Sequence, residues 1–175
     1  MRIGIPREIK VLENRVGLTP GSVREVVAHG HQVVVEHNAG QGIGMDDEAY
    51  RKAGATIAGT AAEVFAAADM VVKVKEPQAG ERKLLRPGHV LFTYLHLAPD
   101  PEQAADLVAS DAVCIAYETV TSASGGLPLL APMSEVAGRM AIQAGAYYLE
   151  KPHGGPGVLL GGVPGVDPAK VVVLG

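Results

Sequence analysis

The 175-residue sequence predicts an α/β fold with a mostly parallel sheet flanked by helices. Short runs rich in valine and isoleucine alternate with alanine-rich stretches, several of which begin with helix-capping residues. Hydrophobic residues make up 47% of the chain and charged residues 19%, which is typical of a globular protein. Because alternating strands and helices are joined by right-handed crossovers, the pattern favours a parallel sheet with helices on both faces.

Each expected strand is a run of β-branched and other apolar residues. The strands are expected at residues 2–6, 31–37, 70–75, 89–95 and 112–118. The helices between them are expected at residues 19–30, 46–54, 60–68 and 100–110. Thr19 is expected to cap the first helix, with Pro20 in its first turn and Gly30 as its stop. Thr60 and Glu63 have the spacing of a capping box.

The character of the sequence changes after about residue 121. A loop rich in Gly and Pro precedes one long helix at 133–151, for which Ser134 is the expected N-cap and which we expect to leave the first domain as a hinge. A second Gly- and Pro-rich stretch leads to the run VVVLG at 171–175. This run is typical of a buried parallel strand that ends on the first glycine of a nucleotide-binding loop, although one glycine is a weak signal.

Composition argues against several classes of partner. The formal net charge of −4 and the scattered lysines and arginines leave no basic surface for nucleic acid. No apolar run approaches the roughly 20 residues of a membrane span, and the N-terminus has no signal-peptide core, so we expect a cytoplasmic protein. Cys114 is the single cysteine, which excludes an internal disulfide or a cysteine-based metal site and favours inert packing in a strand.

Polar residues gather where the expected strands end. They are Arg7, Glu8, Glu13, Asn14, Arg15, Lys75, Glu76, Tyr94, His96 and Glu118. Ligands bind beyond the carboxyl ends of parallel strands, and a small carboxylate substrate would need cations and a group that titrates near neutrality. The cations are supplied by Arg15 and Lys75, and the group that titrates near neutrality is His96. Each also has a structural interpretation: the cations can be solvated, the histidine can be a core residue, and Glu118 can pair with a nearby cation.

The sequence resembles the N-terminal part of the alanine dehydrogenase family. The resemblance rests on MRIGIPREIKVLENRVGLTPGSV, VVKVKEP, YLHLAPD and LAPMSEVAGRMAIQAGAYYLEK, which together cover nearly the whole chain. It implies a substrate-binding α/β domain at 1–128, a linker helix at 129–152 and the start of an NAD-binding Rossmann domain at 153–175. Such enzymes interconvert L-alanine and pyruvate with NAD, usually as hexamers.

The resemblance also implies roles for individual residues. Arg15 and Lys75 would bind the substrate carboxylate, and Lys75 would polarise the carbonyl. His96 would be the acid/base partner of the carbonyl or carbinolamine oxygen. Met133 would line the pocket for the methyl group. Two residues would contact the cofactor: Ser134, and Gly175 as the first glycine of the Rossmann loop.

The truncated nucleotide-binding motif leads us to expect an inactive fragment that carries the substrate site. Two alternatives remain open. One is the NAD-binding alpha subunit of proton-translocating transhydrogenase, whose members lack the lysine and histidine found here at Lys75 and His96. The other is a non-catalytic module that binds a keto acid, against which the unpaired apolar strand at the end of the chain argues.

Overall fold

The computed structural model describes residues 1–174, which form two compact units. The first unit is Met1–Gly125 and contains every strand of the sheet. The second begins at Gly126 and is dominated by the helix α6, Ala131–Leu149. Within residues 1–174, no helix has both the length and the apolar character that crossing a membrane requires.

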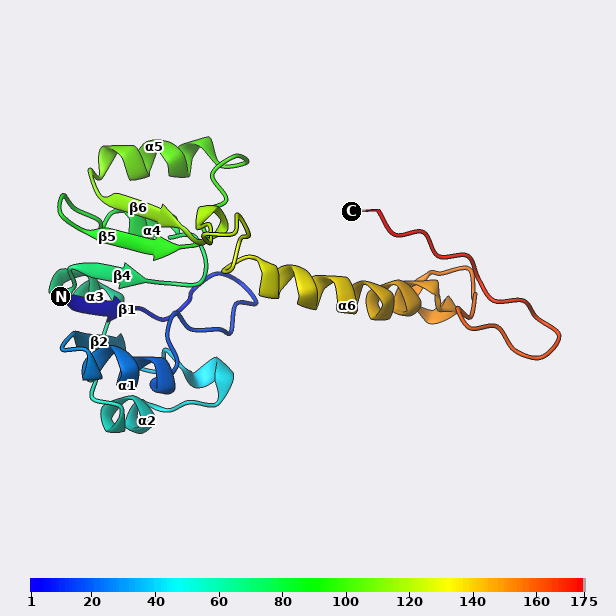
Figure 1. Ribbon diagram of the computed structural model, residues 1–175, viewed down its shortest axis with the longest axis horizontal. Coiled ribbons are helices and arrows are strands. Elements are labelled where there is room, and N and C mark those ends of the chain that lie inside the picture. Colours follow the sequence, from blue (N-terminus) through cyan, green and yellow to red (C-terminus); the bar gives the residue numbers. More distant parts are fainter. Residues whose placement is uncertain (175) are drawn as a thin grey trace. The chain divides into compact units, whose positions relative to one another are not determined.

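The first unit is a six-stranded parallel sheet, which confirms the predicted fold class (Figure 1). The strands are β1 Arg2–Ile5, β2 Gln32–Glu36, β3 Thr56–Ala58, β4 Met70–Val72, β5 Val90–Thr93 and β6 Val113–Ala116. Their order in the sheet is β3-β2-β1-β4-β5-β6. The chain therefore builds outward from β1 in one direction and from β4 in the other, so the strand order reverses between these two neighbours.

The helices connect the strands and begin at capping side chains. They are α1 Pro20–Ala28, α2 Asp47–Lys52, α3 Ala61–Ala67, α4 Ala79–Arg82 and α5 Pro101–Ala109, with short 3₁₀ turns at Gln41–Ile43 and Tyr117–Thr119. Thr19 Oγ1 accepts from the Ser22 amide 3.4 Å away, so the expected cap is confirmed. Thr60 and Glu63 form the expected capping box.

Two apolar clusters pack against this sheet. One joins strand residues such as Ile5 and Val35 to Val23 of α1 and Tyr50 of α2, and the other gathers around Phe65 and Leu91. Gly4 on β1 allows α3 to come close, because a Cβ there would lie 2.8 Å from the Cβ of Ala68. Valines buried on both sides of the strands are the pattern of a parallel sheet covered on both faces.

Several expected boundaries in the first unit were wrong. The strand β3 and the one-turn helix α4 were not predicted, since three and four residues are too few to show a period. Regular pairing in β4 ends at Val72 rather than at 75.

The expectations for the second unit also need correction. Ser134 is not the N-cap of α6, because the helix begins at Ala131, where Pro132 suits the first turn, and Leu130 is the cap residue. Residues 171–174 form no strand, since a strand requires a hydrogen-bonded neighbour and none of residues 1–170 pairs with them.

The second unit has helical and turn structure but no core of its own. No residue between 126 and 174 is buried. Val136 and Met140 on α6 are both more than half exposed. After α6, the ring of His153 stacks on Tyr147 at 3.6 Å, and a short antiparallel bridge joins Val163 to Val166.

Candidate functional site

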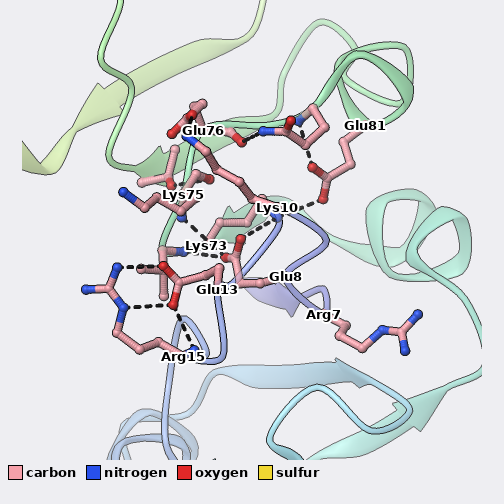
Figure 2. A network of polar contacts seen from close by, with 12 residues as sticks. Arg7, Glu8, Lys10, Glu13, Arg15, Lys73, Lys75, Glu76 and Glu81 are labelled. Carbon is pink, nitrogen blue, oxygen red and sulfur yellow. Dashed lines mark hydrogen bonds and ion pairs between the residues drawn. The ribbon is translucent and has the colours of Figure 1, made fainter. Parts of the chain in front are cut away.

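The polar residues predicted to meet at the strand ends belong to the first unit. Figure 2 shows those that follow β1 and β4, the two strands between which the strand order reverses. The segment after β1 supplies Glu8, Glu13 and Arg15, and the segment after β4 supplies Lys73 and Lys75. This is the position at which open α/β sheets bind their ligands.

A buried ion triad lies beneath this edge. The Nζ atom of Lys73 lies 3.2 Å from Oε2 of Glu8 and 2.7 Å from Oε1 of Glu81, and the lysine is 0% exposed. Burial raises the pKa of Glu8, although Lys73 and the Val74 amide oppose this effect. A buried pair or triad of charges is costly to desolvate, so each member depends on the others.

The triad also fixes the backbone that carries Lys75. Oε1 of Glu8 accepts from the amide of Val74 at 2.6 Å and from that of Lys75 at 3.4 Å, while the Lys75 carbonyl accepts from Oγ1 of Thr93 at 2.9 Å. The Lys75 ammonium group itself makes no hydrogen bond or ion pair with any other residue in 1–174. A half-buried cation on a rigid backbone, with no hydrogen bond or ion pair of its own within residues 1–174, is suited to an anionic ligand.

Lys75 and His96 line one pocket of about 360 Å³. The other lining residues are Lys10, Glu76, Pro99, Asp100 and Gln103. Nδ1 of His96 lies 3.7 Å from Oε2 of Glu76, and Glu76 is also ion-paired with Lys10. Although burial acts to raise it, the pKa of Glu76 is lowered overall by the Lys10 hydrogen bond and by nearby positive charge. Glu76 therefore stays ionised beside the imidazole.

Arg15 is bonded to Glu13 and lines a second pocket. Its Nε and Nη2 atoms contact Oε1 and Oε2 of Glu13 at 2.8 and 2.6 Å, and this hydrogen bonding lowers the pKa of Glu13. Arg15 lines a second pocket of about 280 Å³ with Glu8, Asn14 and other residues, and not the pocket of His96. The two sets are still electrostatically connected, because Lys75 also contributes to lowering the pKa of Glu13.

Glu118 is hydrogen-bonded to the backbone of the loop that carries His96 and, within residues 1–174, forms no ion pair with a lysine or arginine. Its Oε1 accepts from the amides of Leu95 at 3.1 Å and His96 at 2.8 Å, and Oε2 lies 3.3 Å from the Leu95 amide. Burial acts to raise the pKa of Glu118, but these amides lower it overall. Glu118 thus contributes to the site by holding the loop on which His96 lies.

Three expected site residues belong to the second unit by their position in the chain. Met133 and Ser134 belong to α6 in the second unit, where the Ser134 hydroxyl lies 3.5 Å from the Leu130 carbonyl oxygen. Gly175 lies outside the described residues.

Sequence reasoning missed Lys73, Glu81, Lys10 and Gln103. Only Lys73 carried a signal: it alternates with Val72 and Val74 in an expected strand, and a lysine inside a strand covered on both faces requires buried counter-ions. Within residues 1–174, no group of three or more His, Cys, Asp or Glu side chains is placed to hold a metal ion.

The strand order and the charged edge at its reversal place the first unit in the Rossmann-like class of α/β domains. Known families match nearly the whole chain. The model for "Alanine dehydrogenase/PNT, N-terminal domain" matches residues 4–137, and that for "Alanine dehydrogenase/PNT, C-terminal domain" matches residues 141–175. The chain therefore belongs to the alanine dehydrogenase/PNT family.

Individual relatives agree with the family model. The chain is 57% identical to an alanine dehydrogenase from Methanococcus maripaludis, over 100% of this chain and 47% of the relative. A solved L-alanine dehydrogenase is 50% identical with a TM-score of 0.86, covering 96% of this chain and 46% of that one. A transhydrogenase structure from Sinorhizobium meliloti is 32% identical with a TM-score of 0.63, covering 67% and 35%. The chain spans about half the length of the curated relatives it matches.

Proposed function

We propose that this chain carries the substrate-binding part of an NAD-dependent L-alanine dehydrogenase and binds pyruvate or L-alanine. The observation that carries the proposal is the Lys75 ammonium group, which shares a pocket with His96 and makes no hydrogen bond or ion pair within residues 1–174. The 57% identity to a protein named alanine dehydrogenase supports this choice of substrate.

The pocket residues suit the chemistry of a keto acid. The Lys75 ammonium would attract the carboxylate and stabilise negative charge that develops on the carbonyl oxygen. His96, half exposed beside the ionised Glu76, would give a proton to that oxygen or take one from it. Arg15 would bind the carboxylate through its guanidinium group, and the ligand would then compete with Glu13 for the Nε and Nη2 donors.

The described residues do not form a dinucleotide site by themselves. The loop from β2 into α2 contains Gly40, Gly42 and Gly44, but α2 opens with the carboxylates of Asp46, Asp47 and Glu48, which would repel a dinucleotide phosphate. The Ser134 hydroxyl is directed at the Leu130 carbonyl oxygen at the start of its own helix. A role for Ser134 and Gly175 at the cofactor, a methyl pocket at Met133, a hexameric assembly and a cytoplasmic location remain parts of the proposal.

Calorimetric titration of the 175-residue chain with pyruvate tests the substrate site. We expect binding that is at least about tenfold weaker in Lys75→Met, because a hydrogen bond from a charged group is lost. Lys52→Met removes an exposed cation at the end of α2 and is the matched control. No binding by the parent chain, or an equal loss in both variants, would contradict the proposed site.

Titration with NADH separates the alternatives. NADH binding in the absence of pyruvate binding would favour the transhydrogenase alternative. The 32% identity to a transhydrogenase supports that alternative less strongly than the 57% identity supports alanine dehydrogenase. Pyruvate binding without NADH binding would agree with a substrate site whose cofactor site needs further residues.

A further inference from the structure

The loop that presents His96 has an unusual backbone. His96 has φ = +49°, a left-handed conformation that residues with a side chain adopt infrequently. Such conformations persist where the surroundings determine them and are concentrated at functional sites. The contacts around His96 therefore indicate what keeps its imidazole in the pocket.

Two side chains from different elements form hydrogen bonds with the backbone just before His96. Glu118, in the 3₁₀ turn after β6, accepts from the amides of Leu95 and His96. Gln103, on the first turn of α5, donates from Nε2 to the Leu95 carbonyl oxygen at 2.6 Å. The Leu95 carbonyl and the His96 amide belong to one peptide group, so Gln103 and Glu118 hold it from both ends.

Gln103 is placed unusually for a glutamine in a short surface helix. It is 0% exposed, and its backbone amide donates to the capping carboxylate of Asp100 at 2.9 Å. Glutamine is rarely buried without a hydrogen-bonding reason. The bond to the Leu95 carbonyl is that reason, since Oε1 of Gln103 has no hydrogen-bond partner within residues 1–174.

We propose that Gln103 is a positioning residue that, with Glu118, locks the Leu95–His96 peptide in the left-handed conformation and so directs His96 into the Lys75 pocket. Gln103 acts through the loop backbone and requires no contact with substrate. The importance of this role for catalysis rests on the proposed function, whereas the lock itself is a property of the ligand-free chain.

Nuclear magnetic resonance of the labelled 175-residue chain tests the lock directly. In Gln103→Met, which keeps the length of the side chain but has no donor, we expect the Leu95 and His96 amides to exchange with solvent about tenfold faster. The backbone carbon shifts of His96 should move toward extended values. Leu107→Ala, also buried on α5 but in the apolar cluster, is the control for general destabilisation. Unchanged exchange in Gln103→Met, or an equal change in Leu107→Ala, would overturn the proposal.

A measurement on the parent chain covers the case in which Gln103→Met does not fold. The side-chain amide protons of Gln103 should exchange more slowly than those of the exposed Gln32, because one of them is bonded to the Leu95 carbonyl. Equal exchange at the two glutamines would overturn the proposal. Neither readout depends on pyruvate, so the lock can be established even if pyruvate fails to bind, and failure of the lock leaves the pyruvate test unaffected.

Discussion

The two units of this chain contain similarly apolar sequences but differ completely in burial. Residues 1–125 place valine, isoleucine, leucine and aromatic side chains in two clusters against a six-stranded sheet. Residues 126–174 bury no side chain, although α6 carries Val136, Met140 and Ile142. The difference shows that hydrophobic residues stabilise a fold only where a second layer covers them. The contacts that hold the candidate site in place all lie in the unit with the layers.

The two units should differ most in the loss of unfolding free energy when one cation is removed from each. Lys73→Met leaves two buried carboxylates without their counter-ion and is expected to lower the free energy of unfolding by about 3–5 kcal/mol. Arg139→Met in α6 removes a cation that is 79% exposed and that, within residues 1–174, is paired with Glu135 alone, so its effect should be close to zero. Urea denaturation followed by circular dichroism measures both.

A triple variant separates the loss of charge balance from the loss of packing at Lys73. In Glu8→Gln/Lys73→Met/Glu81→Gln, no charge remains within the triad itself, and we expect part of the lost stability to return. If Lys73→Met costs no more than Arg139→Met, the triad does not contribute to stability and the comparison between the units fails at this position.

Truncation of an apolar side chain should also lower the free energy of unfolding more in the first unit than in the second, by a somewhat smaller difference than removal of a cation. Leu91→Ala removes a fully buried side chain from β5 and is expected to cost about 2–5 kcal/mol. Ile142→Ala truncates a side chain on α6 that is 48% exposed, and surface changes of this kind usually stay within about 0.5 kcal/mol. Equal losses in thermal or urea unfolding would mean that α6 packs against a layer as the first unit does.

The smallest expected effect is a decrease in the stability of the first unit at low pH, caused by protonation of His89. This histidine is 0% exposed, and burial together with nearby Arg86 lowers its pKa in the folded protein. The unfolded chain therefore binds a proton more readily, so stability contributed by neutral His89 is present above about pH 6.5 and declines as the pH falls toward its folded-state pKa. His89→Phe should flatten this decline, whereas His29→Phe, which replaces a side chain that is 69% exposed, should not. A parallel decline in both variants would exclude His89 as the cause.

Local signals explain which parts of the fold could be predicted. The capping box of Thr60 and Glu63 and the valine-rich strands are encoded within a few residues, so the α/β class and the polar strand ends were predictable. Partnerships between distant residues were not. Glu81 lies in a helix of four residues with no periodic pattern, and nothing local indicates that its carboxylate reaches Lys73. The strand expected at 171–174 failed for the same reason, because pairing depends on a neighbour elsewhere.

The candidate site shows the same contrast between features that a local pattern predicts and contacts that it does not. Lys75 and His96 line one pocket, and they follow parallel strands whose ends meet at one edge of the sheet. The separate pocket of Arg15 was not foreseen, because the side chain of Glu13 competes for the guanidinium group from only two residues away. Gln103 was not predicted because its role depends on a carbonyl group and not on a pattern of residue types.

The buried triad has a consequence for how the chain folds. Glu8 and Lys73 are separated by 65 positions along the chain, and Glu81 follows eight positions after Lys73. An intermediate that brings together only two of the three segments would have to remove charges from water without completing their network. Such half-assembled states are disfavoured, so β1, β4 and α4 should become ordered together in one cooperative step. The triad should therefore disfavour incorrect strand pairing. A chain that pairs the wrong strand with β1 would leave the Lys73 charge without its carboxylate partners.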